Sequence, residues 1–544
     1  MVTLHRAIWD HCLLAARQIA GADTADANSD ANSNSNSKPT IAGLEGCDAP
    51  FINLLQRQAA QILRIDADDI PRASPLISRR LDDLIEIAHA RFYAYPPSDV
   101  PACWRHLYTD ASILLFAARW SSFRNRRETL PRASNLRVLR QQTNFNLNLT
   151  TADLDLLIRP LDLALILAGG AGPQSRGRAW IHETLDLLHW VLEEDDACLV
   201  EEGDTDTHGP RKRPRQHITD PPSLRAPRGQ RVHDFASEQQ FNDKGSDGGD
   251  VFTPPVERPI PVSGPLGFEE FQEYLDRDRG RKRTPLVLKG MLERWPAFDK
   301  QGQRLWSSPA YLMHRTLRGR RLVPVEVGRS YVDEGWSQKI VPFEEVLAPL
   351  AGWTNGDTAP KGKDEAQPTM YLAQHALFSQ IPQLQADLAI PDACYTSTWT
   401  EDDGGNNDDD DIGIPEVPVN AWIGPAGTIT PLHTDPHHNL LAQVVGRKYI
   451  RLYAPEHTAA LEPRGYEEGG IDMNNTSKVD VGVVEGWDVV EEADEINDDE
   501  RNRFRDIPYV DCILEPGDTL YIPLGWWHYV RSLRVSFSVS FWWN

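Results

Sequence analysis

The sequence predicts an α+β protein with more than one domain, in which an all-helical N-terminal part precedes a β-rich C-terminal part. Three observations lead to this prediction. The 544 residues exceed the length that one hydrophobic core usually covers. Apolar residues recur at helical spacing up to about residue 200, and from residue 257 onward short apolar runs alternate with turn residues. The stretch between them contains hardly any apolar residues, as a linker would.

Residues 1–200 are expected to form an all-α domain. Helical spacing is present in FINLLQRQAAQIL from residue 51, SPLISRRLDDLIEIAHARFYAY from 74, ACWRHLYTDASILLFAARW from 102 and AWIHETLDLLHWVLEE from 179. Residues 23–48 should form a low-complexity loop, because the repeat ADANSDANSNSNSKP is too polar to bury. The stretch AGGAGPQS from residue 168 fits the end of a helix. A dinucleotide-binding loop is the alternative, although its full glycine pattern is missing.

Residues 201–256 are predicted to be a disordered linker of basic and polar composition. They include RKRPR, residues Arg211 to Arg215, an exposed basic cluster in an otherwise acidic chain. Such a cluster fits a nuclear import signal, and it also arises by chance. We therefore expect a nuclear protein, with a cytoplasmic fraction also allowed.

The charge balance favours a basic partner. Lys and Arg number 56 and Asp and Glu 80, so the formal net charge is -24. This excess opposes binding to phosphate backbones, so we expect a basic protein or peptide as partner and no direct nucleic-acid binding. The six cysteines form no C-x-x-C pair, which indicates neither a disulfide framework nor a cysteine zinc site and favours an intracellular protein. The longest apolar run, LDLALILAGGAG from residue 161, is too short to cross a membrane, so no membrane association is expected.

Residues 257–544 are expected to form the β-rich domain. Its strand-like runs are TPLVLKG from residue 284, RLVPVEVG from 321, QPTMYLAQ from 367, NAWIGPAGTITPLHTD from 420, RKYIRLYAP from 447, DTLYIPL from 518 and RVSFSVSFWWN from 534. Two acidic stretches, EDDGGNNDDDD from residue 401 and EEADEINDDE from 491, interrupt them. They are interpreted as solvated surface loops, with partner-binding sites as the alternative.

A metal site is predicted from three side chains in this domain. If residues 428–435 are extended, His433 and Asp435 project from one face of the strand, because side chains two apart share a face. His528, in YIPLGWWHYVRS, lies at the end of another strand-like segment and supplies a third ligand. Two histidines and one carboxylate suit Fe(II), since other coordination positions stay open. An H-x-D triplet alone is common and does not establish metal binding.

Lys448 adds support, because it shares the apolar face of its strand with Ile450 and Leu452. Burying an unpaired ammonium is unfavourable, so a bound carboxylate would be its natural partner. A lysine that reaches solvent at the strand end is the alternative. In the last strand, one face carries serines and Trp542, which would suit either a ligand pocket or a solvent-facing edge; the serines are Ser536, Ser538 and Ser540.

Three stretches, PAGTITPLHTDPHHNLLAQVVGRKYIRLYAP, WWHYVRS and SFSVSFWWN, resemble the JmjC-domain Fe(II)- and 2-oxoglutarate-dependent oxygenases. The resemblance covers roughly residues 284–544. It implies a cupin-like double-stranded β-helix for the C-terminal domain. It also implies a dioxygenase that uses Fe(II), with 2-oxoglutarate and O2 as co-substrates.

The resemblance assigns roles residue by residue. It implies that the metal ligands, which are also the catalytic residues, are His433, Asp435 and His528. The residues at positions that contact 2-oxoglutarate are Tyr371, Thr430, Asn439 and Lys448. Those that match the substrate pocket are Glu326, Tyr331, Trp336, Trp422 and Trp542. An acid among aromatic rings suits a cationic side chain. His437 and His438 are expected to lie outside the ligand set.

The implied function is oxidation of a basic peptidyl residue on a histone-like or other Arg- or Lys-bearing protein. Arginyl hydroxylation and histone lysine demethylation both remain open, because they use the same metal chemistry on different carbons. The alternative is a non-catalytic JmjC-fold module that binds basic peptides. Loss of a metal ligand would indicate such a module, and all three ligands are present.

Overall fold

The computed structural model describes residues 2–21, 41–67, 75–96, 99–128, 149–203, 241, 252–277, 283–298, 305–333, 335–353, 369–398, 416–467, 470, 472–488 and 498–544. The chain divides into two units, Met1–Gln230 with Arg320–Leu322 and Arg231–Gly319 with Val323–Asn544. Most of the expected low-complexity loop and linker, including Arg211 to Arg215, lies outside the described residues. So do the first acidic stretch and all but residues 498–500 of the second.

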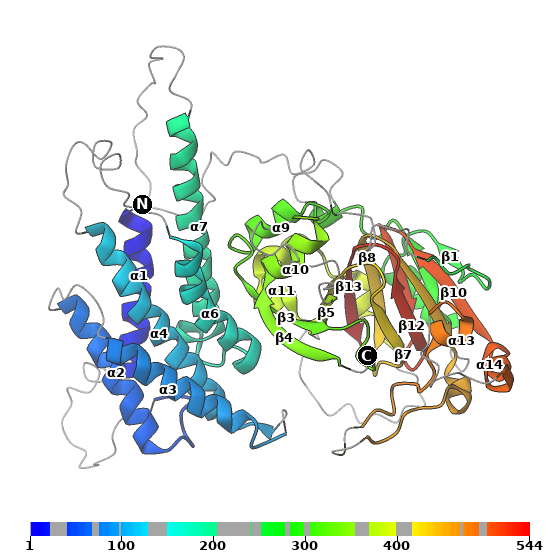
Figure 1. Ribbon diagram of the computed structural model, residues 1–544, viewed down its shortest axis with the longest axis horizontal. Helices are drawn as coiled ribbons and strands as arrows, with labels where there is room; N and C mark the ends of the chain where they lie inside the picture. Colours follow the sequence, from blue (N-terminus) through cyan, green and yellow to red (C-terminus); the bar gives the residue numbers. More distant parts are fainter. Residues whose placement is uncertain are drawn as a thin grey trace, which may run out of the picture. The chain divides into compact units, whose positions relative to one another are not determined.

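The N-terminal unit is helical, as expected (Figure 1). Helix α4 lies at its centre and packs against α1, α3 and α6. The large rings of Trp9, Trp120 and Trp180 are fully buried in this bundle. The helices are α1 (Val2–Ala20), α2 (Ala49–Ala67), α3 (Pro75–Phe92), α4 (Ala102–Glu128), α6 (Thr151–Ala168), the short η3 (Gln174–Arg176) and α7 (Arg178–Gly203).

Helix α6 shows why the glycine-rich stretch follows it. Thr150 caps its first turn reciprocally with Asp153. At its other end Gly169 adopts φ 68°, the left-handed conformation that glycine takes without a steric penalty. The stretch from residue 168 therefore ends a helix, and the alternative of a dinucleotide-binding loop is wrong, because such a loop follows a strand and this stretch follows α6 directly. Within the described part of the chain, no helix is long and apolar enough to span a membrane.

The C-terminal unit contains two sheets. The nine-stranded sheet has the order β1-β2-β11-β8-β13-β6-β5-β3-β4, and the four-stranded sheet the order β10-β9-β12-β7. The strands are β1 (Val262–Ser263), β2 (Leu286–Lys289), β3 (Leu322–Val327), β4 (Ser337–Pro342), β5 (Met370–His375), β6 (Val419–Gly424), β7 (Ile429–His433), β8 (His438–Val445), β9 (Lys448–Tyr453), β10 (Tyr509–Leu514), β11 (Asp518–Ile522), β12 (Trp527–Ser532) and β13 (Ser536–Trp543).

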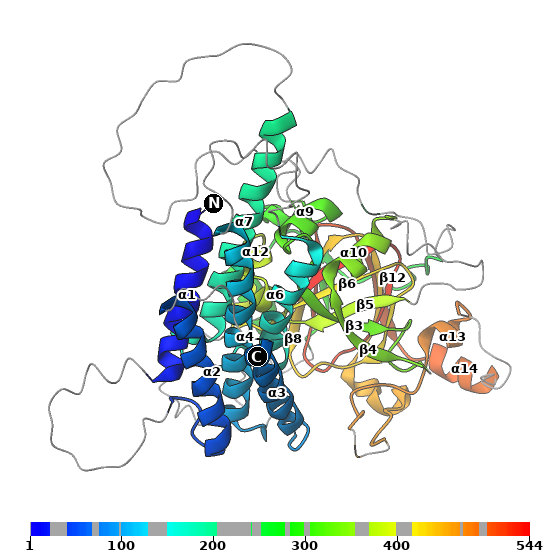
Figure 2. The same cartoon turned by 60° about the vertical axis from the view of Figure 1, so that its left-hand side comes forward.

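Short helices cover the outer faces of both sheets. Those of the nine-stranded sheet are α8 (Phe268–Arg277), α9 (Pro309–Arg315), α10 (Phe343–Leu350), α11 (Leu377–Gln380) and α12 (Pro382–Gln385), with η4 (Pro296–Phe298) and η5 (Asp392–Tyr395). Beside the four-stranded sheet lie η7 (Pro455–Leu461), α13 (Val481–Glu485) and α14 (Asp498–Arg505). Helices α13 and α14 are neighbours in both views (Figure 1, Figure 2).

An apolar cluster lies between the two sheets. Leu441 and Leu520 come from the nine-stranded sheet, and Ile450, Leu452 and Val530 from the four-stranded one. Separate clusters pack the outer faces against the helices. Two sheets that enclose a common interior confirm the cupin-like double-stranded β-helix.

The structure corrects one expectation about the strands and decides between two alternatives for another. Strand β7 ends at His433 rather than at residue 435, because the Thr434 N–H donates to the carbonyl of Asn475, 2.8 Å away, and leaves the ladder. The serine face of β13 is not a solvent edge. This strand pairs with β6 and β8 on its two sides, and Ser536, Ser538 and Ser540 are buried.

Candidate active site

Strand pairing brings the predicted site residues to one face of the four-stranded sheet. Residues opposite each other on neighbouring strands project from the same face. Lys448 lies opposite Ser532, and His528 lies opposite both Leu452 and His433. All of these therefore face the interior cluster to which Leu452 belongs. Lys448 thus points inward as predicted, and the alternative of a lysine that reaches solvent is wrong, since its exposed fraction is 1%.

A register shift between β12 and β7 adds Thr430 to this face. Thr430 and His433 are three residues apart, and in a regular strand they would project to opposite sides. The irregularity between His528 and Val530 places Thr430 opposite Val530, a residue of the interior cluster. Thr430 and His433 consequently both face the interior.

The predicted metal ligands His433, Asp435 and His528 converge. The Nε2 atom of His433 lies 3.8 Å from Oδ1 of Asp435, and Nε2 of His528 lies 3.5 Å from Oδ2 of the same carboxylate. The ligand atoms of the three side chains all lie within 4.8 Å of one another. Asp435 reaches this position from the turn after β7, not from the strand itself.

Each imidazole is oriented by a backbone carbonyl. The Nδ1 atom of His433 lies 2.8 Å from the carbonyl oxygen of Pro431, and Nδ1 of His528 lies 3.1 Å from that of Trp526. A carbonyl oxygen only accepts, so both Nδ1 atoms carry the proton. The lone pairs on Nε2 are then free to bind a metal.

The protonation states also suit a metal. Burial, followed by the neighbouring His528, lowers the pKa of His433 to about 4, so that this imidazole is neutral at neutral pH. Burial would raise the pKa of Asp435, but the contacts with His528 and His433 outweigh this effect and lower the pKa to about 2. The ionised Asp435 carboxylate and the neutral His433 imidazole are donors that suit a divalent transition metal.

A polar pocket surrounds the ammonium of Lys448. Its Nζ donates to the Tyr371 hydroxyl 3.3 Å away and lies 5.7 Å from the ring centre of Tyr371 and 6.0 Å from that of Trp422. Burial lowers the pKa of Lys448 to about 7, and no carboxylate of the described residues is close enough to counter this. Oδ1 of Asn439 is buried and has no hydrogen-bond partner among the described residues. The pocket therefore fits a carboxylate ligand.

The predicted substrate residues lie next to this pocket. Glu326 pairs with Tyr371 across β3 and β5, and burial raises the pKa of Glu326 despite the neighbouring Trp336. Burial also raises the pKa of Tyr331. The hydrogen bond to Thr476 opposes this increase, and the negative charges of Glu326 and Asp435 add to it. Tyr331 thus lies near both the acid and the metal ligands.

The remaining two tryptophans belong to the nine-stranded sheet. Trp422 in β6 donates from Nε1 to the Ser540 hydroxyl at 3.0 Å. Trp542 in β13 lies opposite Asn439 and stacks on His437, with ring centres 5.3 Å apart. His438 is buried and its Nδ1 accepts from the Leu524 N–H, so this side chain lies outside the ligand set as expected.

One part of the site was not predicted. Residues 475–477 run antiparallel beside the end of β7, where Thr476 forms a bridge with His433 and the Ser477 N–H donates to the Leu432 carbonyl at 2.8 Å. The hydroxyl of Thr476 lies 3.2 Å from that of Tyr331. The sequence MNNTSKVD around it has no alternation of apolar residues that would have indicated a strand.

Comparison with known proteins agrees with the fold. The cupin-like domain family matches residues 272–544, half of the chain. Lysine-specific demethylase 8 of Danio rerio is 41% identical over 312 residues, which are 57% of this chain and 64% of the relative. Lysine-specific demethylase JMJ30 of Arabidopsis thaliana is 41% identical over 269 residues, with 49% and 52% covered. Jumonji C domain-containing protein 5 of Drosophila melanogaster is 38% identical over 285 residues, with 52% and 60% covered.

The chain covers less than two thirds of the length of each of these relatives. The matched segment contains both sheets apart from β1, and therefore the whole candidate site. The resemblance to the JmjC-domain proteins is thereby confirmed, and the chain belongs to the cupin-like domain family.

Proposed function

We propose that this protein is an Fe(II)- and 2-oxoglutarate-dependent oxygenase that acts on a basic peptidyl residue. The observation that carries the proposal is the buried Lys448, which projects from the same sheet face as the two metal-binding imidazoles. A buried cation is unfavourable unless an opposite charge neutralises it, and the carboxylate of a bound ligand would do so. The names of two relatives, both lysine-specific demethylases, support the same class of reaction.

The residues of the site would form two groups, one that binds the metal and one that binds the co-substrate. The Nε2 atoms of His433 and His528 and the carboxylate of Asp435 would hold Fe(II), and Lys448 with Tyr371, Thr430 and Asn439 would hold 2-oxoglutarate. Iron, O2 and 2-oxoglutarate together supply oxidation of an unactivated C–H bond when they are bound. The protein would orient the substrate and keep water out, since the ligands and Lys448 are largely buried.

The carboxylate of Glu326 would receive the positive charge of the substrate side chain. Its neighbours Tyr331 and Trp336 offer aromatic rings to the cation, and so does Trp422, which packs on Tyr371 opposite Glu326. Arginine and methylated lysine both satisfy this chemistry, so the substrate class is a basic protein segment. The excess of negative charge on the chain agrees with such a partner.

The test is succinate formation from 2-oxoglutarate by anaerobically purified, Fe(II)-loaded protein, with and without histone-derived and other Arg- and Lys-rich peptides. Succinate that increases with a peptide supports the proposal. Mass spectrometry of the peptide then separates the gain of one oxygen from the loss of a methyl group. Peptide binding without any turnover by the iron-loaded protein would instead favour a non-catalytic binding module.

We also propose that the protein enters the nucleus through the basic cluster Arg211 to Arg215. A fluorescent fusion should move toward the cytoplasm when these five positions are replaced by alanine or glycine. The control replaces residues 221–225, PPSLR, in the same segment. Nuclear accumulation that persists without the basic cluster contradicts this assignment.

A further inference from the structure

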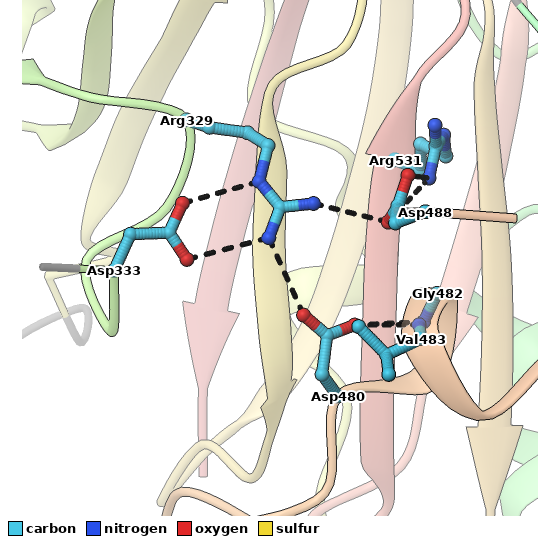
Figure 3. Close-up of polar contacts among 7 residues, drawn as sticks. All are labelled: Arg329, Asp333, Asp480, Gly482, Val483, Asp488 and Arg531. Atoms are coloured by element: carbon cyan, nitrogen blue, oxygen red, sulfur yellow. Dashed lines mark hydrogen bonds and ion pairs between the residues drawn. The ribbon is translucent and has the colours of Figure 1, made fainter. Parts of the chain in front are cut away.

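Two arginines and three aspartates form a charged cluster between the loop after β3, the α13 segment and strand β12 (Figure 3). The guanidinium of Arg329 reaches all three carboxylates: Nε lies 3.1 Å from Asp333, Nη1 3.0 Å from Asp488 and Nη2 3.4 Å from Asp480. Arg531 contacts both oxygens of Asp488, at 2.8 and 2.9 Å. We refer to these five residues as the arginine–aspartate cluster.

The cluster joins three separate parts of the chain. Arg329 and Asp333 belong to the β3–β4 loop, described here at residues 328–333 and 335–336. Asp480 caps α13 by accepting from the N–H groups of Gly482 and Val483 at 2.8 and 3.2 Å, and Asp488 follows the same helix. Arg531 belongs to β12, three positions after the metal ligand candidate His528. Arg329 therefore ties the loop to α13 and, through Asp488, to the strand that carries His528.

The β3–β4 loop carries two of the predicted substrate residues. Tyr331 lies two positions after Arg329, and the Trp336 N–H donates to the carbonyl of Asp333. The hydroxyl of Tyr331 meets that of Thr476, which precedes the cap residue Asp480 by four positions. The contact between Tyr331 and Thr476 thus joins the β3–β4 loop to the segment before α13. Arg329 joins the loop to the same segment through Asp480.

The charges of the cluster explain why Arg329 is the residue that holds the segments together. Burial opposes its charge, yet the bond to Asp333 and the charges of Asp480 and Asp488 raise the pKa of Arg329. Asp488 would keep Arg531 as a partner if Arg329 were lost. Asp333 and Asp480 would then face each other as unneutralised carboxylates, and their repulsion would push the loop away from α13.

We propose that Arg329 is a positioning residue for the substrate, which sets the place of Tyr331 and Trp336 without touching substrate itself. The inference rests on the proposed function, since it concerns how the basic peptide is bound. Lys448 lies on β9, which pairs with β10 and β12 and not with the β3–β4 loop. The loop meets β7 through the backbone bond from the Ile429 N–H to the Arg329 carbonyl at 3.1 Å, which a change of the Arg329 side chain leaves in place. Arg329 consequently governs the KM for the peptide and not the affinity for 2-oxoglutarate.

The test compares Arg329→Ala with Arg505→Ala in the full chain. Arg505 is a matched control: its side chain is 38% exposed like that of Arg329, and it also binds next to α13, through Glu485 at 3.2 Å and the Val484 carbonyl. Arg329→Ala should raise the KM for the peptide roughly tenfold, because displacing the side chains that position a substrate weakens its binding. Turnover of 2-oxoglutarate without peptide, and the KM for 2-oxoglutarate, should stay within about twofold. Arg505→Ala should change none of these.

Two further variants separate positioning from a loss of folding. Arg329→Lys keeps the charge but not the planar fork, so it should restore part of the peptide KM. Asp333→Asn weakens only the contact within the loop, because it removes the negative charge and one of the two acceptor oxygens, and it should raise the peptide KM less than Arg329→Ala does. A wild-type peptide KM in both Arg329→Ala and Asp333→Asn overturns the inference, as does an equal loss of turnover with and without peptide. A wild-type protein that forms no succinate with any basic peptide would overturn the proposed function instead.

Discussion

The ammonium nitrogen of Lys448 lies 3.3 Å from the hydroxyl oxygen of Tyr371, and both side chains are buried between the two sheets. A hydroxyl group does not neutralise a positive charge, and burial lowers the pKa of Lys448 to about 7. The protein without ligand therefore carries a group whose charged form is unfavourable where it stands. Under the proposed function, the distal carboxylate of 2-oxoglutarate removes this penalty.

Lys448→Met should make the ligand-free protein more stable while abolishing co-substrate binding. The ordinary pKa of lysine is 10.5, so the penalty is fully present below about pH 7 and disappears as the pH rises toward 10.5. At neutral pH we expect a gain on the order of 2 kcal/mol in the free energy of unfolding. Chemical denaturation at neutral and high pH measures it. Lower stability of the variant at neutral pH, or unchanged 2-oxoglutarate affinity, would contradict the role of Lys448.

Binding of 2-oxoglutarate should take up a proton above neutral pH. At about one pH unit above its pKa Lys448 is mostly neutral, and a bound carboxylate raises that pKa, so uptake approaches one proton per site. About one unit below, the lysine is already charged and uptake should be small. Calorimetry in buffers of different ionisation enthalpy gives the number of protons. The same uptake in Lys448→Met would assign the effect to another group.

His528→Ala should remove the metal. The variant deletes one of the two Nε2 ligand atoms and leaves Asp435 with one imidazole neighbour. Affinity for Fe(II) should fall by more than about 100-fold, since changes to groups that only orient ligands already cost about 10- to 100-fold. Elemental analysis of anaerobically prepared protein reports it. The control is His457→Ala, which lies in η7 outside the ligand cluster. Full occupancy in the His528 variant would exclude the proposed centre.

Glu326→Gln should weaken binding of the basic peptide. The amide keeps the shape of the side chain but loses the negative charge that would face the substrate cation, so we expect a peptide KM about 30-fold higher. The affinity for 2-oxoglutarate should not change. Glu515→Gln, which affects the exposed pair with Arg447, serves as the control. An unchanged peptide KM would place the substrate charge elsewhere.

Gly446→Ala should destabilise the hairpin that sets the register of Lys448. Gly446 has φ 74°, and an added Cβ would collide with the carbonyl oxygen of Val535. We expect a loss of about 3 kcal/mol in the free energy of unfolding. Gly427→Ala is the matched control, because its φ is 86° but no atom lies within 4 Å of the added Cβ, so that only backbone strain of about 1 kcal/mol remains. Equal losses in the two variants would show that the contact with Val535 is unimportant.

Alternation along single strands was enough to predict several features of the site. It placed Lys448 on the inner face of β9 with Ile450 and Leu452, because a strand repeats every two residues. It did not predict that the other face is buried too. Tyr449, Arg451 and Tyr453 are covered by the cluster that includes α13, and the Arg451 guanidinium lies 3.9 Å from the ring centre of Tyr509.

Local patterns in the chain were sufficient to predict the helical first half and the strand-rich second half and to nominate candidate metal ligands, because each of these depends mainly on neighbouring residues. The register between β12 and β7, which turns Thr430 inward beside His433, exists only once the two strands pair. The approach of Thr476 to His433 and the contacts of Arg329 with Asp480 and Asp488 likewise join segments distant in the chain. Such contacts depend on how whole sheets and loops pack, so local periodicity does not predict them.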